Sequence, residues 1–125
     1  MIKAKQYGEL VCVTRGTNTV RVGGEVMAKV YVVNNTNHNY SKAEQYGELV
    51  YVTKGKLPIF KTNTVRAMLE KGLTEFTKDD YLLISGPAIV NIMAATILYN
   101  KFDTVKFLVF DAKQQDYVVR HLSKK

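Results

Sequence analysis

Four short polar segments carry the groups in this chain that are best suited to chemistry. Each segment directly follows a run of apolar residues that is typical of a β-strand. The candidate binding residues are Asn34, Asn35, His38, Thr53, Ser85, Gly86 and Asp111. Their amides, hydroxyls, imidazole and backbone N–H groups can bind a ligand through hydrogen bonds, whereas Asp111 is the one carboxylate among them that could serve catalysis. We therefore expect a binding site rather than a catalytic centre at these residues.

Ser85 and Gly86 offer the most defined chemistry. They stand before Pro87, a residue type that suits the first position of a helix. Free backbone N–H groups at a helix start bind phosphate or carboxylate groups. The same residues also form an ordinary turn between a strand and a helix, so the sequence alone leaves both interpretations open.

A catalytic role would centre on His38. A histidine needs a reacting or orienting partner to act as a general base or acid, and Asp111 is the conceivable carboxylate. A solitary surface histidine explains His38 as well. A nucleoside-processing enzyme therefore ranks behind a non-enzymatic binding protein among the functions that the sequence allows.

Neither a metal site nor a cofactor is predicted. The two histidines, His38 and His121, are far apart, and no CxxC, HxxxH or HxxE spacing occurs. Glycine-rich phosphate loops of the GxGxxG or GxxxxGKS type are also missing from the sequence. The one cysteine, Cys12, excludes an internal disulfide.

The composition is that of a globular protein of ordinary size. The chain has 125 residues, 46% of them hydrophobic and 23% charged. Its net charge of +7 comes from scattered basic residues, so nucleic-acid binding is not indicated. The longest apolar stretch, residues 87–99, is too short to span a membrane. Residues 1–10 lack the apolar core of a signal peptide, so we expect a cytoplasmic protein.

The elements that must position the candidate residues follow one another regularly from Met27 onward. Runs of apolar and β-branched residues predict strands at 29–33, 48–53, 81–84, 105–110 and 116–122. Helices are predicted to begin near residues 41, 62 and 87. This βαβαβαββ order is typical of a mostly parallel sheet with right-handed crossovers.

We therefore predict an α/β domain over residues 27–125, with a three-layer Rossmann-like fold. The expected strand order is 2-1-3-4-5, with the last strand antiparallel at an edge. Ligands bind at the carboxyl ends of the strands in such sheets, near the switch in strand order. All four polar segments come to that rim.

The helix boundaries follow from capping and periodicity. Ser41 and Glu44 predict a capping box for the first helix, and Gly47 predicts a left-handed end. Thr62, Asn63 or Thr64 is expected to cap the second helix. Its apolar face comprises Val65, Met68, Leu69, Leu73 and Phe76, with Gly72 on the inner side. The third helix is apolar nearly all round, so it should be buried or lie at a subunit contact.

The first 26 residues repeat part of this domain. Residues 3–16 match residues 42–55 at 11 of 14 positions, and TNTVR occurs at both 17–21 and 62–66. The first copy lacks the preceding strand, and two glycines follow it where the second copy continues as a helix. We interpret residues 1–26 as a partial duplicate, either a hairpin of 10–14 with 19–22 or a mobile extension.

Three stretches carry a resemblance to a known group: KVYVVNN, HNYSKAEQYGELVYVTKG and DDYLLISGPAIVNIMAA. Across residues 27–122 they resemble small, uncharacterised bacteriophage-encoded proteins. The resemblance implies a phage gene expressed in the cytoplasm of a bacterial host. Small phage proteins often counter host defences, so the resemblance also implies antagonism of host defences as an association. It transfers no functional residue.

The leading hypothesis is a non-enzymatic domain that binds a nucleotide-like or other phosphate-bearing ligand, or a host protein, at the rim. The alternative is a homo-oligomeric structural or interaction protein that binds no small ligand. The apolar third helix and the exposed edge strands favour that alternative.

Overall fold

The computed structural model describes residues 21–22, 25–26 and 28–124. Two short strands come first, β1 Arg21–Val22 and β2 Glu25–Val26, and they pair antiparallel. The predicted hairpin of residues 10–14 with 19–22 lies mostly outside the described residues. Within them, residues 21–22 pair with β2.

Five strands form one mixed sheet in the order β4-β3-β5-β6-β7. Their bounds are β3 Lys29–Asn35, β4 Glu48–Lys54, β5 Tyr81–Leu83, β6 Thr104–Asp111 and β7 Asp116–Ser123. The first four run parallel to their neighbours, and β7 runs antiparallel to β6. Counted from the strand after Met27, this is the predicted order 2-1-3-4-5, with the predicted antiparallel edge.

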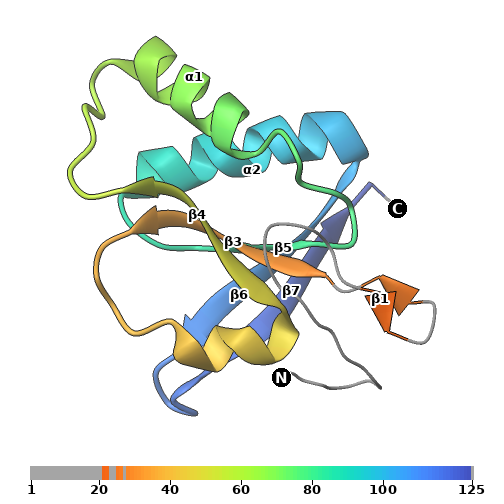
Figure 1. Ribbon diagram of the computed structural model, residues 1–125. Helices are drawn as coiled ribbons and strands as arrows, with labels where there is room; N and C mark the ends of the chain where they lie inside the picture. The colour runs from red at the N-terminus through yellow and green to blue at the C-terminus, as the bar shows by residue number, and fades with distance from the viewer. Residues whose placement is uncertain (1–20, 23–24, 27, 125) are drawn as a thin grey trace.

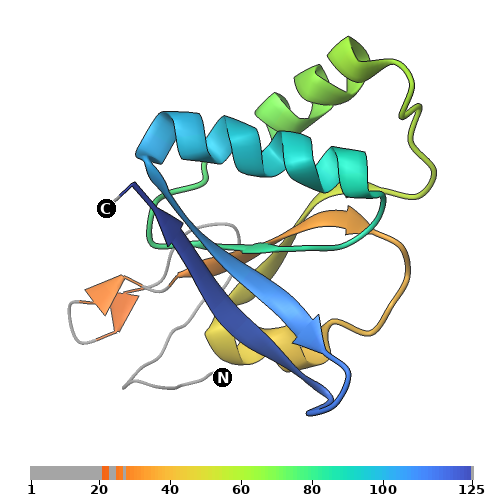
Figure 2. The ribbon, with the colours of Figure 1, turned by 180° about the vertical axis from the view of Figure 1, so that it is seen from behind.

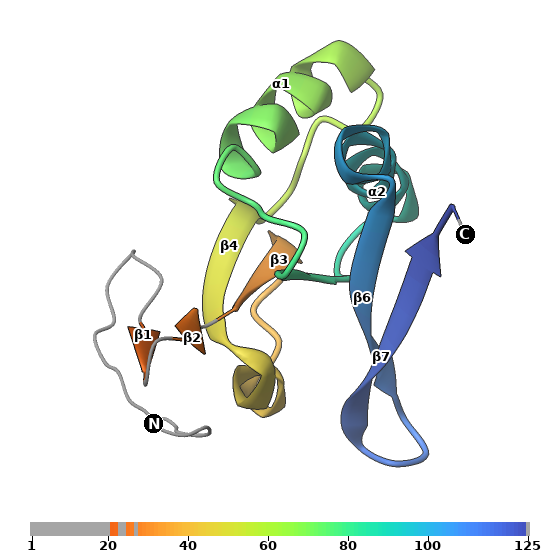
Figure 3. The same ribbon diagram turned by 90° about the vertical axis from the view of Figure 1, so that its right-hand side faces the viewer.

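Helices cover both faces of this sheet (Figures 1 and 3). On one face lie α1 Thr62–Gly72 and α2 Ala88–Phe102. On the other face lies η1 Ser41–Tyr46, a single short helix. The architecture is therefore α/β with three layers, and the layer formed by η1 is much thinner than the layer formed by α1 and α2.

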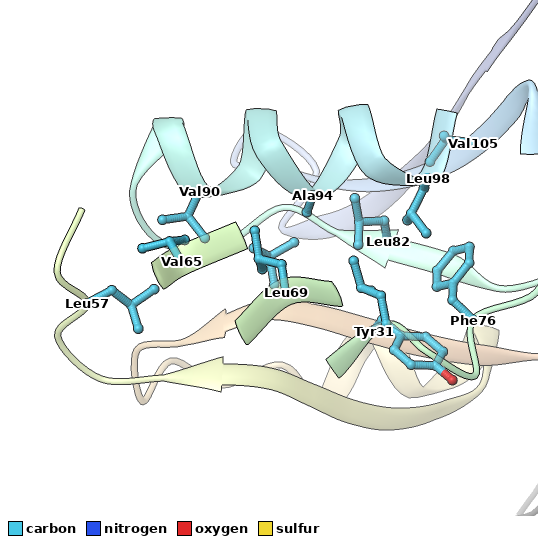
Figure 4. Packing of buried hydrophobic residues seen from close by; sticks show 12 residues of the cluster. Tyr31, Leu57, Val65, Leu69, Phe76, Leu82, Val90, Ala94, Leu98 and Val105 are labelled. Atoms are coloured by element: carbon cyan, nitrogen blue, oxygen red, sulfur yellow. The ribbon is translucent and has the colours of Figure 1, made fainter. Parts of the chain in front are cut away.

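The sheet is buried on both faces because its central strand alternates between two cores. Tyr31 and Val33 point toward α1 and α2, whereas Val30 and Val32 point toward η1. This explains why β3 is an unbroken apolar run rather than an alternating one. Figure 4 shows the larger core, where Leu82 and neighbouring residues from the sheet meet the two helices.

The predicted capping box is wrong. η1 is a 3-10 helix that begins at Ser41, and its cap residue Tyr40 makes no side-chain cap bond. The Ser41 N–H donates to Asn39 Oδ1 at 2.9 Å. Gly47 is not left-handed in the α sense but has φ 155° and ψ 176°. A Cβ there would collide with the Ala28 carbonyl oxygen, so close chain approach requires the glycine.

α1 presents the predicted apolar face, with one exception. Val65, Leu69, Leu73 and Phe76 are buried, but Met68 is 36% exposed. The predicted caps are wrong, because the helix begins at Thr62 and its cap residue makes no side-chain cap bond.

Gly72 closes α1 against the sheet, as its position on the inner side predicted. A Cβ on Gly72 would lie 2.6 Å from Val52 Cγ1 and 3.0 Å from the Val52 carbonyl oxygen. The glycine therefore allows the end of α1 to approach β4 closely.

α2 is buried on one side only. Val90, Ala94 and Leu98 face the core, whereas Ile89 and Ile92 are exposed. The apolar residues on every side of α2 therefore do not mean that the helix is completely buried. It leaves an unpartnered apolar strip on the outer side of the helix.

Candidate functional site

Three loops follow β3, β4 and β5 at one edge of the sheet, and we call residues 34–40, 53–61 and 84–87 the carboxyl edge. Asn34 and Thr53 lie side by side in the parallel register. Thr53 Oγ1 lies 2.7 Å from the Val33 carbonyl oxygen and 2.9 Å from Asn34 Oδ1. Asn34 Nδ2 donates to the Gly55 carbonyl oxygen at 3.1 Å. Both side chains are buried, and their hydrogen bonds hold the ends of β3 and β4 together.

Tyr40 joins the loop after β3 to the loop after β5. Its buried hydroxyl lies 2.9 Å from Ser85 Oγ, accepts the Thr36 N–H at 3.1 Å and reaches the Asn34 carbonyl oxygen at 3.4 Å. Burial of the ring opposes ionisation, but the hydrogen bonds from Ser85 and Thr36 outweigh it and lower the pKa of Tyr40. Tyr40 is thus the centre of the polar network.

The Asn91 side chain holds the turn before α2 through four hydrogen bonds with the backbone of residues 85–87. Its buried side chain accepts the Ser85 N–H through Oδ1 at 3.0 Å. Its Nδ2 lies 3.0 Å from the Ser85 carbonyl oxygen, 3.3 Å from that of Gly86 and 2.8 Å from that of Pro87. The three carbonyl oxygens are therefore turned inward, toward one amide.

Gly86 fits against Asn34. Its φ is +91°, a left-handed conformation that side chains rarely adopt. A Cβ at this position would lie 2.7 Å from Asn34 Cβ and 2.9 Å from Asn34 Nδ2. The contact packs the turn before α2 directly onto the end of β3.

The side chains of the remaining candidates do not join this network. His38 is exposed, and its ring meets that of Tyr40 edge-on at 6.3 Å. Asn35 Oδ1 accepts the Asn37 N–H at 2.9 Å within its own loop. Both residues lie on the surface of the carboxyl edge.

Asp111 serves the β6–β7 turn. Its carboxylate accepts the Lys113 N–H at 2.9 Å and Gln114 Nε2 at 3.1 Å. The tip of this hairpin bends toward η1 (Figure 2), where Gln45 Nε2 lies 3.1 Å from Asp116 Oδ1. Within the described part of the chain, no hydrogen bond joins Asp111 to His38.

Comparison with families of known proteins gives a match over most of the chain. The family model described as phage Pam3 gp32-like protein matches residues 27–123. The chain belongs to the phage Pam3 gp32-like family. This confirms the resemblance to phage proteins over nearly the same residues. No curated protein and no solved structure matches the chain.

The described residues of this gp32-like chain contain neither a metal-binding cluster nor a membrane-spanning helix. No group of three or more His, Cys, Asp or Glu side chains in residues 28–124 could hold a metal ion. None of the helices in that part combines the length and the apolar character that crossing a bilayer requires.

The carboxyl edge has a positive character that the candidate residues did not reveal. Its loops contain Lys54, Lys56 and Lys61 and no acidic residue, and all three lysines are exposed. Phe60, between two of them along the loop, is 95% exposed. The sequence signal for this feature was the segment 56–61, which the first copy of the repeat lacks.

Proposed function

We propose that the chain is a non-enzymatic Rossmann-like domain that binds a nucleotide-like, phosphate-bearing ligand at the carboxyl edge. The observation that carries the proposal is the charge of this edge. Lys54, Lys56 and Lys61 are its only charged side chains, so nothing on the edge offsets them. A phosphate group would find three cations and no competing carboxylate in these loops.

The two helix starts add to this field. α1 and α2 both begin at the carboxyl edge, and neither has an acidic residue in its first turn. A helix N-terminus carries a partial positive charge and unpaired N–H groups that favour anions. Leu57, Val65 and Val90 share one core cluster (Figure 4), so the basic loop packs beside the first turn of α2.

The polar network shapes the turn before α2, and it uses the Ser85 N–H in a bond to Asn91 Oδ1. Asn91 draws the carbonyl oxygens of Ser85, Gly86 and Pro87 inward, away from the surface. Oxygens that would repel a phosphate are thereby removed from its path. The network costs little to keep in place when a ligand arrives, because its bonds already exist.

Phe60 supplies a surface for the base. A phenylalanine side chain that is 95% exposed gains nothing from the core of its own domain. Stacking of a base on an aromatic ring contributes about 1–3 kcal/mol. We therefore assign phosphate recognition to the lysines and base stacking to Phe60.

The same geometry favours binding without catalysis. His38 is the one imidazole at the edge, and its observed neighbour is the Tyr40 ring rather than a carboxylate. Asp111, the carboxylate that a nucleoside-processing enzyme would need, is bonded within the β6–β7 turn. As a phage protein, the chain would act on a host nucleotide or its signalling, which is one route to antagonism of host defence.

Titration calorimetry tests the proposal with mono-, di- and cyclic nucleotides and with inorganic pyrophosphate. We expect the Lys54→Ala/Lys56→Ala variant to weaken binding about tenfold or more, which corresponds to about 1.4 kcal/mol. The matched control is Lys78→Ala/Lys101→Ala, which removes the same charge from exposed positions elsewhere. The proposal is wrong if no member of the panel binds, or if both variants weaken binding equally.

A second candidate is an interaction protein that acts through the outer side of α2. Ile89 is 39% exposed and Ile92 is 59% exposed, and Ile84 at the end of β5 is 37% exposed. Apolar side chains in this arrangement favour contact with another protein or a second copy. Light scattering on the wild-type chain and on Ile92→Lys tests it, because a monomer in both cases removes a homo-oligomeric role.

A further inference from the structure

The N-terminal repeat has nearly the same sequence as residues 42–55, whose structure is described. Residues 42–55 form most of η1, the turn at Gly47 and all of β4. β4 is an edge strand and pairs only with β3 in the five-stranded sheet. Residues 3–16, the N-terminal copy, match this unit at 11 of 14 positions. The question is whether the matching positions are those that hold the unit on β3.

The most demanding position is Gly47. A side chain there would collide with the Ala28 carbonyl oxygen, so only glycine allows the turn to pass the start of β3. Gly8 stands at the same position of the N-terminal copy. Gly55, whose φ of +70° also favours glycine, corresponds to Gly16.

The side chains that attach the unit are also retained. Ala43 is fully buried under the sheet, Thr53 bonds to β3, and the Tyr46 hydroxyl donates to the Tyr117 carbonyl oxygen at 3.2 Å. Val52 packs against Gly72 of α1. Their counterparts in the N-terminal copy are identical, namely Ala4, Thr14, Tyr7 and Val13.

The three differences fall at positions that face solvent. Glu44, Tyr51 and Lys54 are exposed in the folded unit. Lys5, Cys12 and Arg15 replace them in the N-terminal copy. None of the three replacements removes a buried group or a required glycine. The N-terminal copy is therefore chemically equipped to occupy the place of η1 and β4.

We propose that residues 3–16 of one chain occupy the η1–β4 position on β3 of a second copy of the chain. A second copy is required because of reach. β3 and β4 pair over six residue steps, from Lys29–Glu48 to Asn35–Lys54, which is about 20 Å. In this arrangement Gly16 would take the place of Gly55, just beyond the end of β3. Arg21, in contrast, pairs with β2, before the start of β3. The five residues from Gly16 to Arg21 span at most about 18 Å, so the copy cannot reach its own β3 in this arrangement.

Exchange of the two segments conserves the contacts on β3. The incoming segment makes the bonds that the outgoing one made, so the balance depends on chain concentration rather than on new interactions. Reciprocal exchange between two chains gives a closed dimer, and continued exchange gives longer assemblies. The exchanged unit overlaps the carboxyl edge at residues 53–55, where Arg15 would replace Lys54 and keep its positive charge.

Four full-length proteins test the proposal: the wild type, Gly8→Val, Gly47→Val and the double variant. Gly8→Val should unfold at the wild-type temperature, because each chain still has its own β4. Gly47→Val should remain folded by taking residues 3–16 from a neighbour. It should then have about twice the mass of one chain or more, with an unfolding temperature that rises with concentration. The double variant has no competent segment and should lose cooperative unfolding.

Two results would overturn the proposal. One is a Gly47→Val protein whose stability equals that of the double variant. The other is a Gly47→Val protein that folds as a monomer with an unfolding temperature independent of concentration. Cys12→Tyr in the Gly47→Val background is the control, and it should leave assembly unchanged because position 51 is exposed.

Discussion

The Tyr40 hydroxyl lies 2.9 Å from Ser85 Oγ, and this contact joins the loop after β3 to the turn before α2. The two residues are 45 positions apart in the chain. Their bond fixes the relative position of two of the three loops that form the carboxyl edge. The Tyr40 hydroxyl therefore holds the edge together with the Gly86–Asn34 contact.

Tyr40→Phe should lower the free energy of unfolding by about 1–3 kcal/mol, because the Thr36 N–H and Ser85 hydroxyl lose their buried partner. Urea unfolding measures the change. Tyr51→Phe is the matched control, since the Tyr51 side chain is 48% exposed and should show little effect. Equal effects of the two substitutions would contradict a special role for the Tyr40 hydroxyl.

Asn91→Ala should destabilise the chain by about 2–3 kcal/mol, because the amide serves the Ser85 N–H and three carbonyl oxygens in a buried position. Asn100→Ala, on an exposed position of the same helix, serves as the control. Chemical unfolding compares the two. A wild-type stability for Asn91→Ala would show that the turn before α2 does not depend on this amide.

Gly72→Ala should also destabilise the protein, although alanine favours a helix over glycine by about 1 kcal/mol. The new methyl group would lie 2.6 Å from Val52 Cγ1 and 3.0 Å from the Val52 carbonyl oxygen. Overpacking of this kind costs about 1–3 kcal/mol. If thermal unfolding shows Gly72→Ala to be more stable than the wild type, α1 does not need close approach to β4.

The pH dependence should show a loss of stability in alkali. Burial of the ring, with the nearby charge of Asp80, raises the pKa of Tyr31 from 10.0 to about 12. The unfolded chain therefore ionises Tyr31 first, so its contribution is complete below about pH 10 and is lost as pH rises toward 12. The loss should approach about 1.4 kcal/mol per pH unit in this window. Tyr31→Phe should reduce this slope in urea unfolding, and an unchanged slope would contradict the assignment.

Much of the fold follows from local sequence patterns. The unbroken apolar run of β3 indicated a strand buried on both faces. The alternation of strands and helices indicated the parallel order in which β4, β3 and β5 pair. The same reasoning brought Asn34, Thr53, Ser85 and Gly86 to one edge, where they do meet. These predictions succeed because periodicity and connection rules act over short stretches.

The rest depends on contacts between distant segments. Tyr40 and Asn91 are the centres of the network, through partners that periodicity cannot identify. Ser41 fitted a capping box, but the chain instead forms a 3-10 turn in which Asn39 Oδ1 accepts the Ser41 N–H. Asp111 ends a strand at the expected level, yet the antiparallel hairpin uses its carboxylate in its own turn.

The most direct test of the proposed function is a map of backbone amide chemical shifts during titration with a nucleoside diphosphate. The account predicts that the largest changes fall on the backbone amides of Lys54, Lys56, Phe60 and Gly86. It also predicts that these changes disappear together in Lys54→Ala/Lys56→Ala. Changes that cluster on the outer side of α2 or on β7, or no changes at all, would contradict it.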